Sequence, residues 1–132
     1  IPVSGALTSS GAAADLGDAI VDLVQGGGVH ALLLALFAIC LVLGQVISNT
    51  ATALIMIPIG IAAAQDLDVP VPVVLMSITI ACASSYLTPI ATPANMMVQA
   101  PGNFRFGDYW RLGLPLATWF GVVAVFVVPL IW

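Results

Sequence analysis

Long stretches without a charged residue are the feature that most constrains this chain. Three of them, 23–65, 69–104 and 112–132, cover most of its 132 residues. Soluble domains carry about 25% charged residues, whereas this chain carries 6% and is 61% hydrophobic. Along most of its length such a chain has lipid, not water, as its solvent. The sequence therefore predicts an all-α integral membrane protein.

The remaining composition excludes other classes. The chain holds only two basic residues, too few for a nucleic-acid-binding surface. Cys40 and Cys82 lie inside apolar stretches without metal-ligand spacing, so we expect small buried thiols and no disulfide. A signal peptide is not visible. The chain starts on Ile1 inside an apolar segment, and we expect a piece of a longer polypeptide.

Residues 1–28 are expected to hold the end of a membrane helix and a helix at the membrane interface. Residues 1–10 mix apolar and small residues. Three aspartates then recur at helical spacing, with apolar residues on another face, which is typical of an amphipathic helix lying on the bilayer. The acidic face comprises Asp15, Asp18 and Asp22.

Residues 29–65 are predicted to form a re-entrant hairpin with its tip at 48–50. The apolar segment 30–47 would span about 27 Å as a helix, and 51–64 only about 21 Å. The polar tripeptide Ser48–Thr50 separates the two segments and leaves no room for an aqueous loop. The rival interpretation is one helix of about 50 Å.

Residues 69–100 are predicted to form a broken transmembrane helix with its break at 88–95. Pro89 and Pro93 lie four residues apart there and disfavour helix before each of them. Residues 101–132 are expected to be a basic loop and the last transmembrane helix, 112–131, with aromatic anchors. Two arginines favour the cytoplasm for loop 101–111 and place the mouth of the hairpin outside.

The two interruptions are candidate solute sites. Irregular backbone at membrane depth persists only where protein covers it or where it lines a cavity. Helices that begin after Asn49 and after Pro93 direct free N–H groups and positive dipole ends toward an anion. Helix ends before Ser48 and Pro89 expose carbonyls that suit Na⁺, which is a recurring design of secondary transporters.

The interruptions hold no Arg, Lys, Asp or Glu. We therefore expect bound cations to neutralise the charge of a bound anion, which favours cation-coupled symport. Plainer interpretations remain open. The polar cluster at Ser48 is also compatible with a helix cap that bends the chain, and Pro93 with an ordinary kink. His30 is expected at the interface, and no set of nucleophile, base and orienting residue indicates an enzyme.

Three motifs carry a family resemblance: Ser48-Asn49-Thr50 with the apolar run after it, Thr88-Pro89-Ile90-Ala91-Thr92-Pro93-Ala94-Asn95, and the segment 106–116. Together they resemble the C-terminal half of the divalent anion/sodium symporter family, which is solute carrier family 13 of the ion transporter superfamily. The resemblance covers nearly the whole chain. Gly44 departs from it, because relatives have a threonine there.

The resemblance implies an elevator-type transporter, usually a homodimer, in which this chain is the second of two inverted repeats and the N-terminal repeat is missing. It implies a bacterial inner or plasma membrane protein that carries a dicarboxylate, citrate or a sulfate-like oxyanion with sodium. No cofactor besides the transported sodium ion is expected. The substrate-binding residues that it implies are Asn49, Thr50, Thr92 and Pro93. The sodium ligands that it implies are Ser48, Asn49 and the carbonyl of Ala91.

We therefore expect the C-terminal part of a secondary active transporter and no enzyme. Within the family, the loop around Arg105 and Tyr109 is most similar to the sulfate-type branch. One alternative is another permease of the same superfamily, for arsenite or for cation/proton exchange. The other is a structural membrane module without transport activity.

Overall fold

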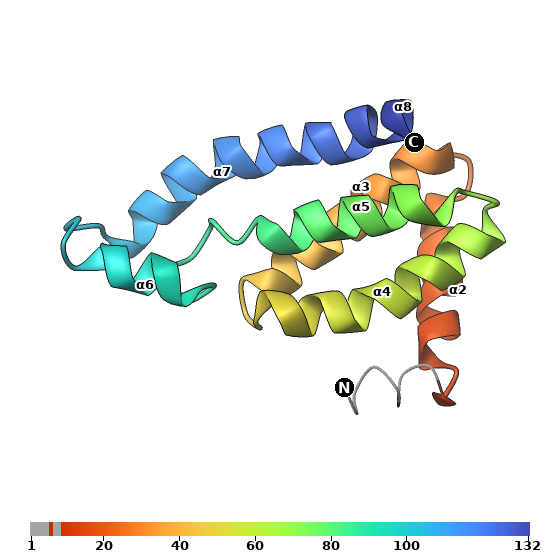
Figure 1. Ribbon diagram of the computed structural model, residues 1–132, viewed down its shortest axis with the longest axis horizontal. Coiled ribbons are helices and arrows are strands. Elements are labelled where there is room, and N and C mark those ends of the chain that lie inside the picture. Colours follow the sequence, from red (N-terminus) through yellow and green to blue (C-terminus); the bar gives the residue numbers. More distant parts are fainter. Residues whose placement is uncertain (1–5, 7–8) are drawn as a thin grey trace.

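The computed structural model describes Ala6 and residues 9–132, and the regular elements in this part of the chain are all helices (Figure 1). In chain order they are α2 (Ala12–Val24), α3 (Gly28–Gly44), α4 (Asn49–Asp66), α5 (Val71–Ala83), α6 (Pro93–Gln99), α7 (Phe106–Val122), the π-helical segment η1 (Val123–Val127) and α8 (Val128–Ile131). The predicted all-α class is confirmed. The membrane-helix end expected in residues 1–10 lies largely outside the described residues.

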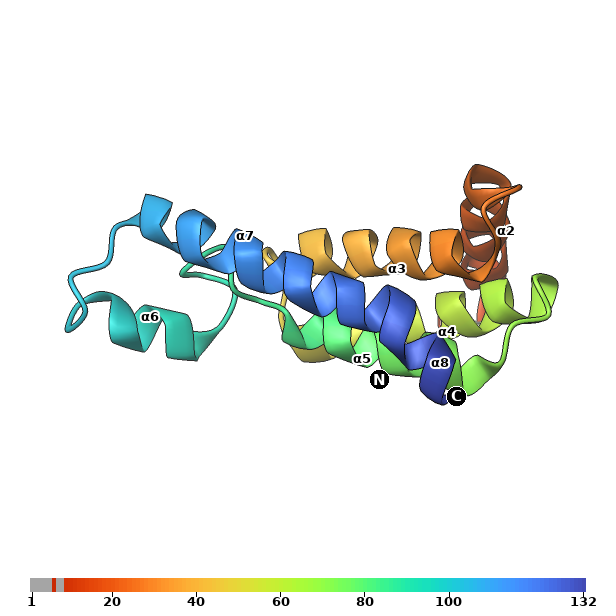
Figure 2. The same ribbon diagram turned by 90° about the horizontal axis from the view of Figure 1, so that it is seen from above.

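Helices α3, α4 and α5 run back and forth beside one another (Figures 1 and 2). A short turn at residues 45–48 joins α3 to α4, and a second turn at 67–70 joins α4 to α5. The 45–48 turn and the first two residues of α4, together residues 45–50, are here called the tip, which therefore lies at the same end of the bundle as the C-terminus of α5. The rival interpretation, one unbroken helix through Asn49, is wrong because the chain reverses direction before that residue.

The core between these helices combines branched apolar side chains with small residues. Fully buried side chains include Leu33 and Leu36 of α3, Met56 of α4 and Ile78 of α5. The thiols of Cys40 and Cys82 are also buried and free, as expected. Small residues let the backbones approach closely, as they do between helices in membranes.

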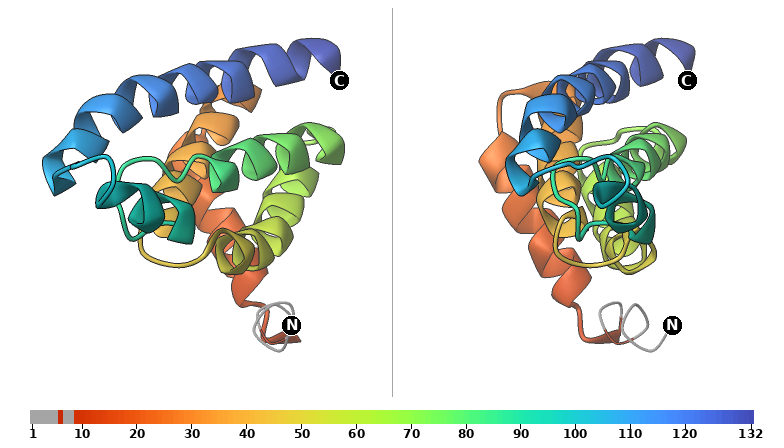
Figure 3. Two further views of the ribbon diagram at one scale, coloured as in Figure 1. Left: turned by 60° about the vertical axis from the view of Figure 1, so that its left-hand side comes forward. Right: turned by 90° about the vertical axis from the view of Figure 1, so that its left-hand side faces the viewer.

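Helix α2 runs across the direction of α3, α4 and α5 at the end away from the tip (Figures 1 and 3). It crosses α4 at Gly17, where a Cβ would lie 3.2 Å from the Cβ of Ala62. Ile20 and Val24 are buried, whereas Leu23 is 85% exposed. A transverse helix with acidic and apolar exposed residues suits a membrane interface.

The last helix starts earlier than predicted. Phe106–Ile131 is continuous and, in the part of the chain that the structure describes, is the one helix long and apolar enough to cross a membrane. It begins at Phe106, not at Leu112, because the Asp108 carboxylate accepts a hydrogen bond from the Arg105 N–H at 2.7 Å. Within it, the Ala124 carbonyl in η1 accepts a hydrogen bond from the buried Ser77 hydroxyl of α5 at 2.9 Å.

Helix α5 ends at Ala83, before the predicted break at 88–95, and the chain is irregular from residue 84 to residue 92. The Ser84 hydroxyl donates to the Ile80 carbonyl at 2.8 Å, and the Ser85 hydroxyl donates to the Cys82 carbonyl at 3.2 Å. These hydroxyls bond to the last turn of α5 while the backbone leaves it. Helix α6 lies beyond the tip and has no buried residue (Figure 1). Residues 84–92 are called the break below.

Candidate functional site

The tip is stabilised by side chains that lie next to it in the sequence. Ser48 has extended backbone angles and is the N-cap of α4, because its hydroxyl oxygen accepts a hydrogen bond from the Ala51 N–H at 3.3 Å. The Thr52 hydroxyl donates to the Ser48 carbonyl at 3.1 Å. Among the described residues, no acceptor is found for the backbone N–H groups of Asn49 and Thr50. The first turn of α4 thus presents two free donors beside an exposed threonine.

The break is organised around the side-chain amide of Asn95. Its Nδ2 donates to the Ser85 carbonyl at 2.8 Å and to the Thr88 carbonyl at 2.9 Å. Thr92 is the N-cap of α6 and accepts a hydrogen bond from the Asn95 N–H at 3.3 Å. The Tyr109 hydroxyl donates to the Asn95 carbonyl at 2.7 Å. Asn95 therefore holds the start of the break, the middle of the break and the start of α7 together.

Gln45, at the beginning of the tip, bonds directly to the break. Its side-chain Oε1 accepts a hydrogen bond from the Leu87 N–H at 3.1 Å. Its backbone carbonyl accepts one from the Thr88 hydroxyl at 3.4 Å. Its Nε2 donates to the Leu41 carbonyl at 3.0 Å and reaches the Ser84 carbonyl at 3.5 Å. The tip and the break are thus adjacent in space although about forty residues separate them in the chain.

A second bond between tip and break reaches a predicted site residue. The Ser85 hydroxyl has one hydrogen, and its shorter bond is to Oδ1 of Asn49 at 2.5 Å, against 3.2 Å to the Cys82 carbonyl. Ser85 is only 2% exposed. Gly44 lies next to this bond: a Cβ there would be 3.4 Å from the Ser85 hydroxyl oxygen, an ordinary van der Waals distance. With Oδ1 engaged, both hydrogens on Nδ2 of Asn49 have no acceptor among the described residues.

The structure brings together some predicted site residues and leaves others apart. Asn49 lies against the break, and Ser48 lies next to it at the start of α4. In the described part of the chain, no hydrogen bond crosses between tip and break from the other predicted residues. These are Thr50, Ala91, Thr92 and Pro93. Of them, Ala91 is buried and Pro93 is exposed.

Sequence reasoning missed Gln45, Ser84 and Ser85. Gln45 carried a signal, because it is the polar residue inside the apolar stretch that leads to the tip. Ser84 and Ser85 had none, because serine is common in membrane helices and often bonds back to its own helix. Their contribution depends on the tertiary contact with the tip.

No charged side chain of the described residues bonds to the tip or the break. Asp108 is engaged with the Arg105 N–H. Asp18 and Asp66 meet at the opposite end of the bundle, where a hydrogen bond with the Asp66 carboxyl, together with its charge, raises the pKa of Asp18. The described site consequently consists of amides, hydroxyls and backbone groups.

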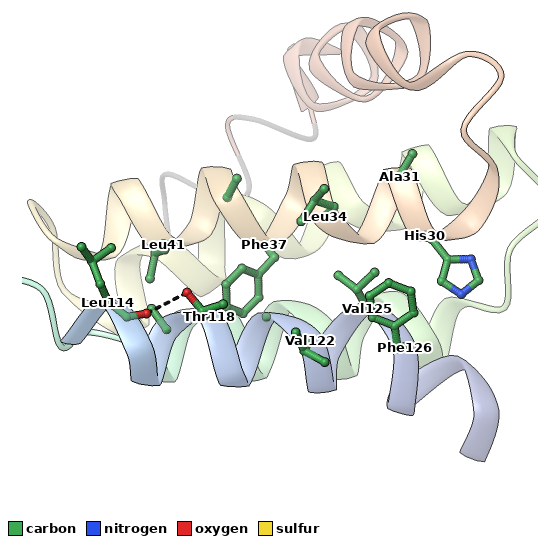
Figure 4. A pocket seen from close by; sticks show the side chains of 13 residues that line it. His30, Ala31, Leu34, Phe37, Leu41, Leu114, Thr118, Val122, Val125 and Phe126 are labelled. Carbon is green, nitrogen blue, oxygen red and sulfur yellow. Dashed lines mark hydrogen bonds between the residues drawn. The ribbon is translucent and has the colours of Figure 1, made fainter. Parts of the chain in front are cut away.

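An apolar groove of about 440 Å³ lies between α3 and the helix formed by α7 and η1, and none of its lining residues belongs to the tip or the break (Figure 4). At one end the rings of His30 and Phe126 are 5.4 Å apart. The Thr118 hydroxyl in the groove already donates to the Leu114 carbonyl at 2.8 Å. A groove with so few free polar groups does not suit an anion, and His30 has no carboxylate partner among the described residues.

Comparison with known proteins adds the family. The citrate transporter family matches residues 1–132. The chain belongs to this family. Its membership, with sodium/sulfate cotransporters among its relatives, confirms the resemblance to divalent anion/sodium symporters.

Three relatives illustrate the match. The uncharacterized transporter YfbS of Escherichia coli (strain K12) is 35% identical over 99% of this chain and 22% of its own length. The uncharacterized transporter sll0640 of Synechocystis is 32% identical over 99% of this chain and 21% of its own length. Sodium/sulfate cotransporter 1 of Chlamydomonas reinhardtii is 30% identical over 95% of this chain and 14% of its own length. The chain thus spans about a fifth or less of these relatives, and all three are named as transporters.

Proposed function

We propose that this chain supplies one half of the solute site of a secondary active transporter that moves a divalent oxyanion together with sodium. The observation that carries the proposal is the arrangement at the tip. Two free N–H groups at the start of α4 and the Nδ2 group of Asn49 lie among uncharged groups. The Asn49 side chain also bonds directly to Ser85 of the break. Helix N-termini with free N–H groups bind anions in this way.

The donors for the anion come from both interruptions. At the tip they are the N–H groups of Asn49 and Thr50 and the amide of Asn49. At the break, the Thr92 hydroxyl accepts the N–H of Asn95 and keeps its own hydrogen free to donate. Pro93 opens α6 without needing an N–H partner. The positive end of the α4 dipole favours negative charge at the same place.

In this proposal, bound sodium ions neutralise the negative charge of the anion. The ligands are oxygen atoms of Ser48 and Asn49 and the carbonyl of Ala91, because hard cations prefer such groups in discontinuous helices. Without a cation, a divalent anion would stay uncompensated among neutral groups in low dielectric, which is costly. The names of the sodium/sulfate cotransporter relatives support both ions and make sulfate the first solute to test. The family description makes citrate the second.

The rest of the site belongs to parts of the transporter outside this chain. We infer a partner repeat of inverted topology that supplies the other half, an elevator-type movement and a homodimer. Residues 29–65 then form a re-entrant hairpin that opens outward, residues 69–100 the broken helix, and loop 101–111 faces the cytoplasm of a bacterial cell. A half-site without its partner repeat does not transport, because its polar backbone would face lipid.

The test uses the complete transporter in proteoliposomes with labelled sulfate and, separately, labelled citrate. We expect uptake of one of them with an inward sodium gradient and little uptake with choline in place of sodium. Equal uptake in choline contradicts sodium coupling, and uptake driven by a proton gradient points to the exchange-type alternative. Absence of uptake of both solutes overturns the proposal.

Two substitutions separate a solute site from a structural module. Asn49→Ala and Thr92→Ala are expected to raise KM about tenfold or more, the cost of one lost hydrogen bond to a charged group, at unchanged protein level. The matched controls are Asn103→Gly, because Asn103 has a φ of 51° that glycine adopts freely, and Thr79→Ala; both positions are exposed and outside the tip and the break. Loss of assembly with unchanged KM in the surviving protein indicates a structural module.

A further inference from the structure

We propose that Gln45 is a positioning residue that sets the register between the tip and the break and thereby orients the solute-binding amide of Asn49. The inference rests on the proposed function, since it concerns the same site. Gln45 itself is not proposed to touch the solute.

The contacts of Gln45 surround the junction between tip and break. Its side chain bonds to Leu87 through Oε1 at 3.1 Å and reaches Ser84 through Nε2 at 3.5 Å. Ser85, which bonds to Asn49, lies between these two residues in the sequence. Gln45 therefore holds the backbone on both sides of Ser85, the residue whose hydroxyl bonds to Asn49. If the break slides along the tip, the Ser85 hydroxyl moves and the Asn49 amide loses its fixed orientation.

Glutamine suits this position because the backbone near the break needs both a hydrogen-bond acceptor and hydrogen-bond donors. Leu87 is only 8% exposed, and its N–H lies in irregular backbone with no helical partner. A buried backbone donor without an acceptor destabilises the folded state, and water is scarce at membrane depth. The Gln45 amide offers an acceptor for Leu87 and, on the same group, donors for Leu41 and Ser84. Among the twenty side chains only Gln and Asn carry both functions on one amide.

The geometry also explains why a neutral group suits this position. A carboxylate at residue 45 would accept from Leu87 but would face the carbonyl oxygens of Leu41 and Ser84 without a hydrogen to donate. A methionine has a similar length and shape but makes neither bond. Comparing these two replacements therefore separates the acceptor function from the donor function.

The first readout is amide hydrogen exchange of residues 84–92 in the complete transporter, which does not depend on transport. In Gln45→Met we expect the Leu87 amide to exchange about tenfold faster, the effect of about 1.4 kcal/mol. In Gln45→Glu, which keeps the acceptor, we expect the same amide to stay within about threefold of the parent. The matched control, Gln65→Met, changes an exposed glutamine at the other end of α4 and should leave the segment unchanged.

The second readout is the kinetics of sulfate uptake, or of citrate uptake if sulfate is not carried. Because Gln45 orients a binding group, Gln45→Met is expected to raise KM about tenfold with kcat changed much less. A variant that lowers kcat and leaves KM unchanged contradicts the positioning role.

The exchange data also decide the case if Gln45→Met fails to assemble. Exchange of Leu87 in Gln45→Glu at the rate of an unprotected amide then overturns the inference, because the acceptor would not be what protects it. Protected exchange in Gln45→Glu supports it. If the parent carries neither solute, the proposed function fails, but the exchange result still shows whether Gln45 holds the break.

Discussion

The tip and the break are both interruptions of apolar helices, yet their backbone groups are satisfied in different ways. At the tip, Val46 and Ile47 donate to the Leu43 carbonyl at 3.0 and 2.9 Å, and Ser48 caps the next helix. In each of these bonds the donor and the acceptor lie within four residues of each other in the sequence. At the break, the partners of the backbone are side chains from other elements, Gln45 from the tip and Asn95 from α6. Most backbone bonds of the tip are thus local, whereas the backbone of the break depends on side chains from other elements.

The difference predicts where the molecule is fragile. A buried polar network that loses one member leaves several groups unsatisfied, and the cost exceeds that of one local bond. Substitutions at the partners of the break should therefore reduce stability more than substitutions at the cap of the tip. Four predictions, from the largest expected effect to the smallest, test this ranking.

Asn95→Asp should have the largest effect. It removes both Nδ2 donors and places a carboxylate against the carbonyl oxygens of Ser85 and Thr88. We expect the free energy of unfolding in detergent to fall by about 3 kcal/mol and solute uptake to be lost. Asn103→Asp is the matched control, because Asn103 is exposed with φ 51°, a conformation that Asp tolerates. Equal effects of the two variants would contradict a special role of Asn95.

Gly113→Ala should come next. A Cβ at Gly113 would lie 2.5 Å from the carbonyl oxygen and 2.8 Å from the carbonyl carbon of Tyr86. Because these atoms are backbone of the break, the break must move, at a cost of about 1–3 kcal/mol in unfolding free energy. Gly107→Ala is the control, since its Cβ meets nothing within 4 Å. Thermal unfolding of the two purified variants measures the difference.

Ser48→Ala tests the local bonding of the tip. It removes the side-chain acceptor of the Ala51 N–H, and loss of an N-cap costs about 1 kcal/mol. Thr79→Ala removes a hydroxyl that bonds only to its own exposed helix face and should change stability by less than about 0.5 kcal/mol. If Ser48→Ala destabilises the protein more than Asn95→Asp does, the ranking of tip and break is wrong.

The smallest effect is expected at the mouth, the end of the bundle away from the tip. The Asp66 carboxyl raises the pKa of Asp18, so the folded state binds a proton more readily than the unfolded state. Stability from this group is present at low pH and is lost as pH rises through the raised pKa. Asp18→Asn should reduce this pH dependence and leave stability at neutral pH equal or slightly higher. A larger loss of stability in the variant as pH rises contradicts the assignment.

Local chemistry was sufficient to predict much of the fold. Apolar stretches interrupted by small polar residues predicted the all-α class, and the glycines and aspartates near the N-terminus predicted the helix that the structure places at Ala12–Val24. At the tip, the polar residues Ser48 and Asn49 stand between apolar runs, and α4 begins at Asn49. These features depend on residues that are close in the sequence, so the sequence alone is enough to predict them.

The break was harder to predict because its boundaries depend on tertiary contacts. The prolines Pro89 and Pro93 suggested an interruption at 88–95, but α5 ends at Ala83. The helix stops early because the backbone of Ser84 and Leu87 finds its partner in the Gln45 side chain. Nothing in the local sequence of the break indicates that partner, which lies about forty residues away.

The most direct test of the account is a double-mutant cycle on Asn49→Ala and Ser85→Ala in the complete transporter. The central claim is that tip and break form one site through the bond between these side chains. Measured on the free energy of unfolding without solute, the account predicts that the two effects are coupled by about 1 kcal/mol. Effects that add to within about 0.3 kcal/mol would show that the tip and the break act independently and would contradict it.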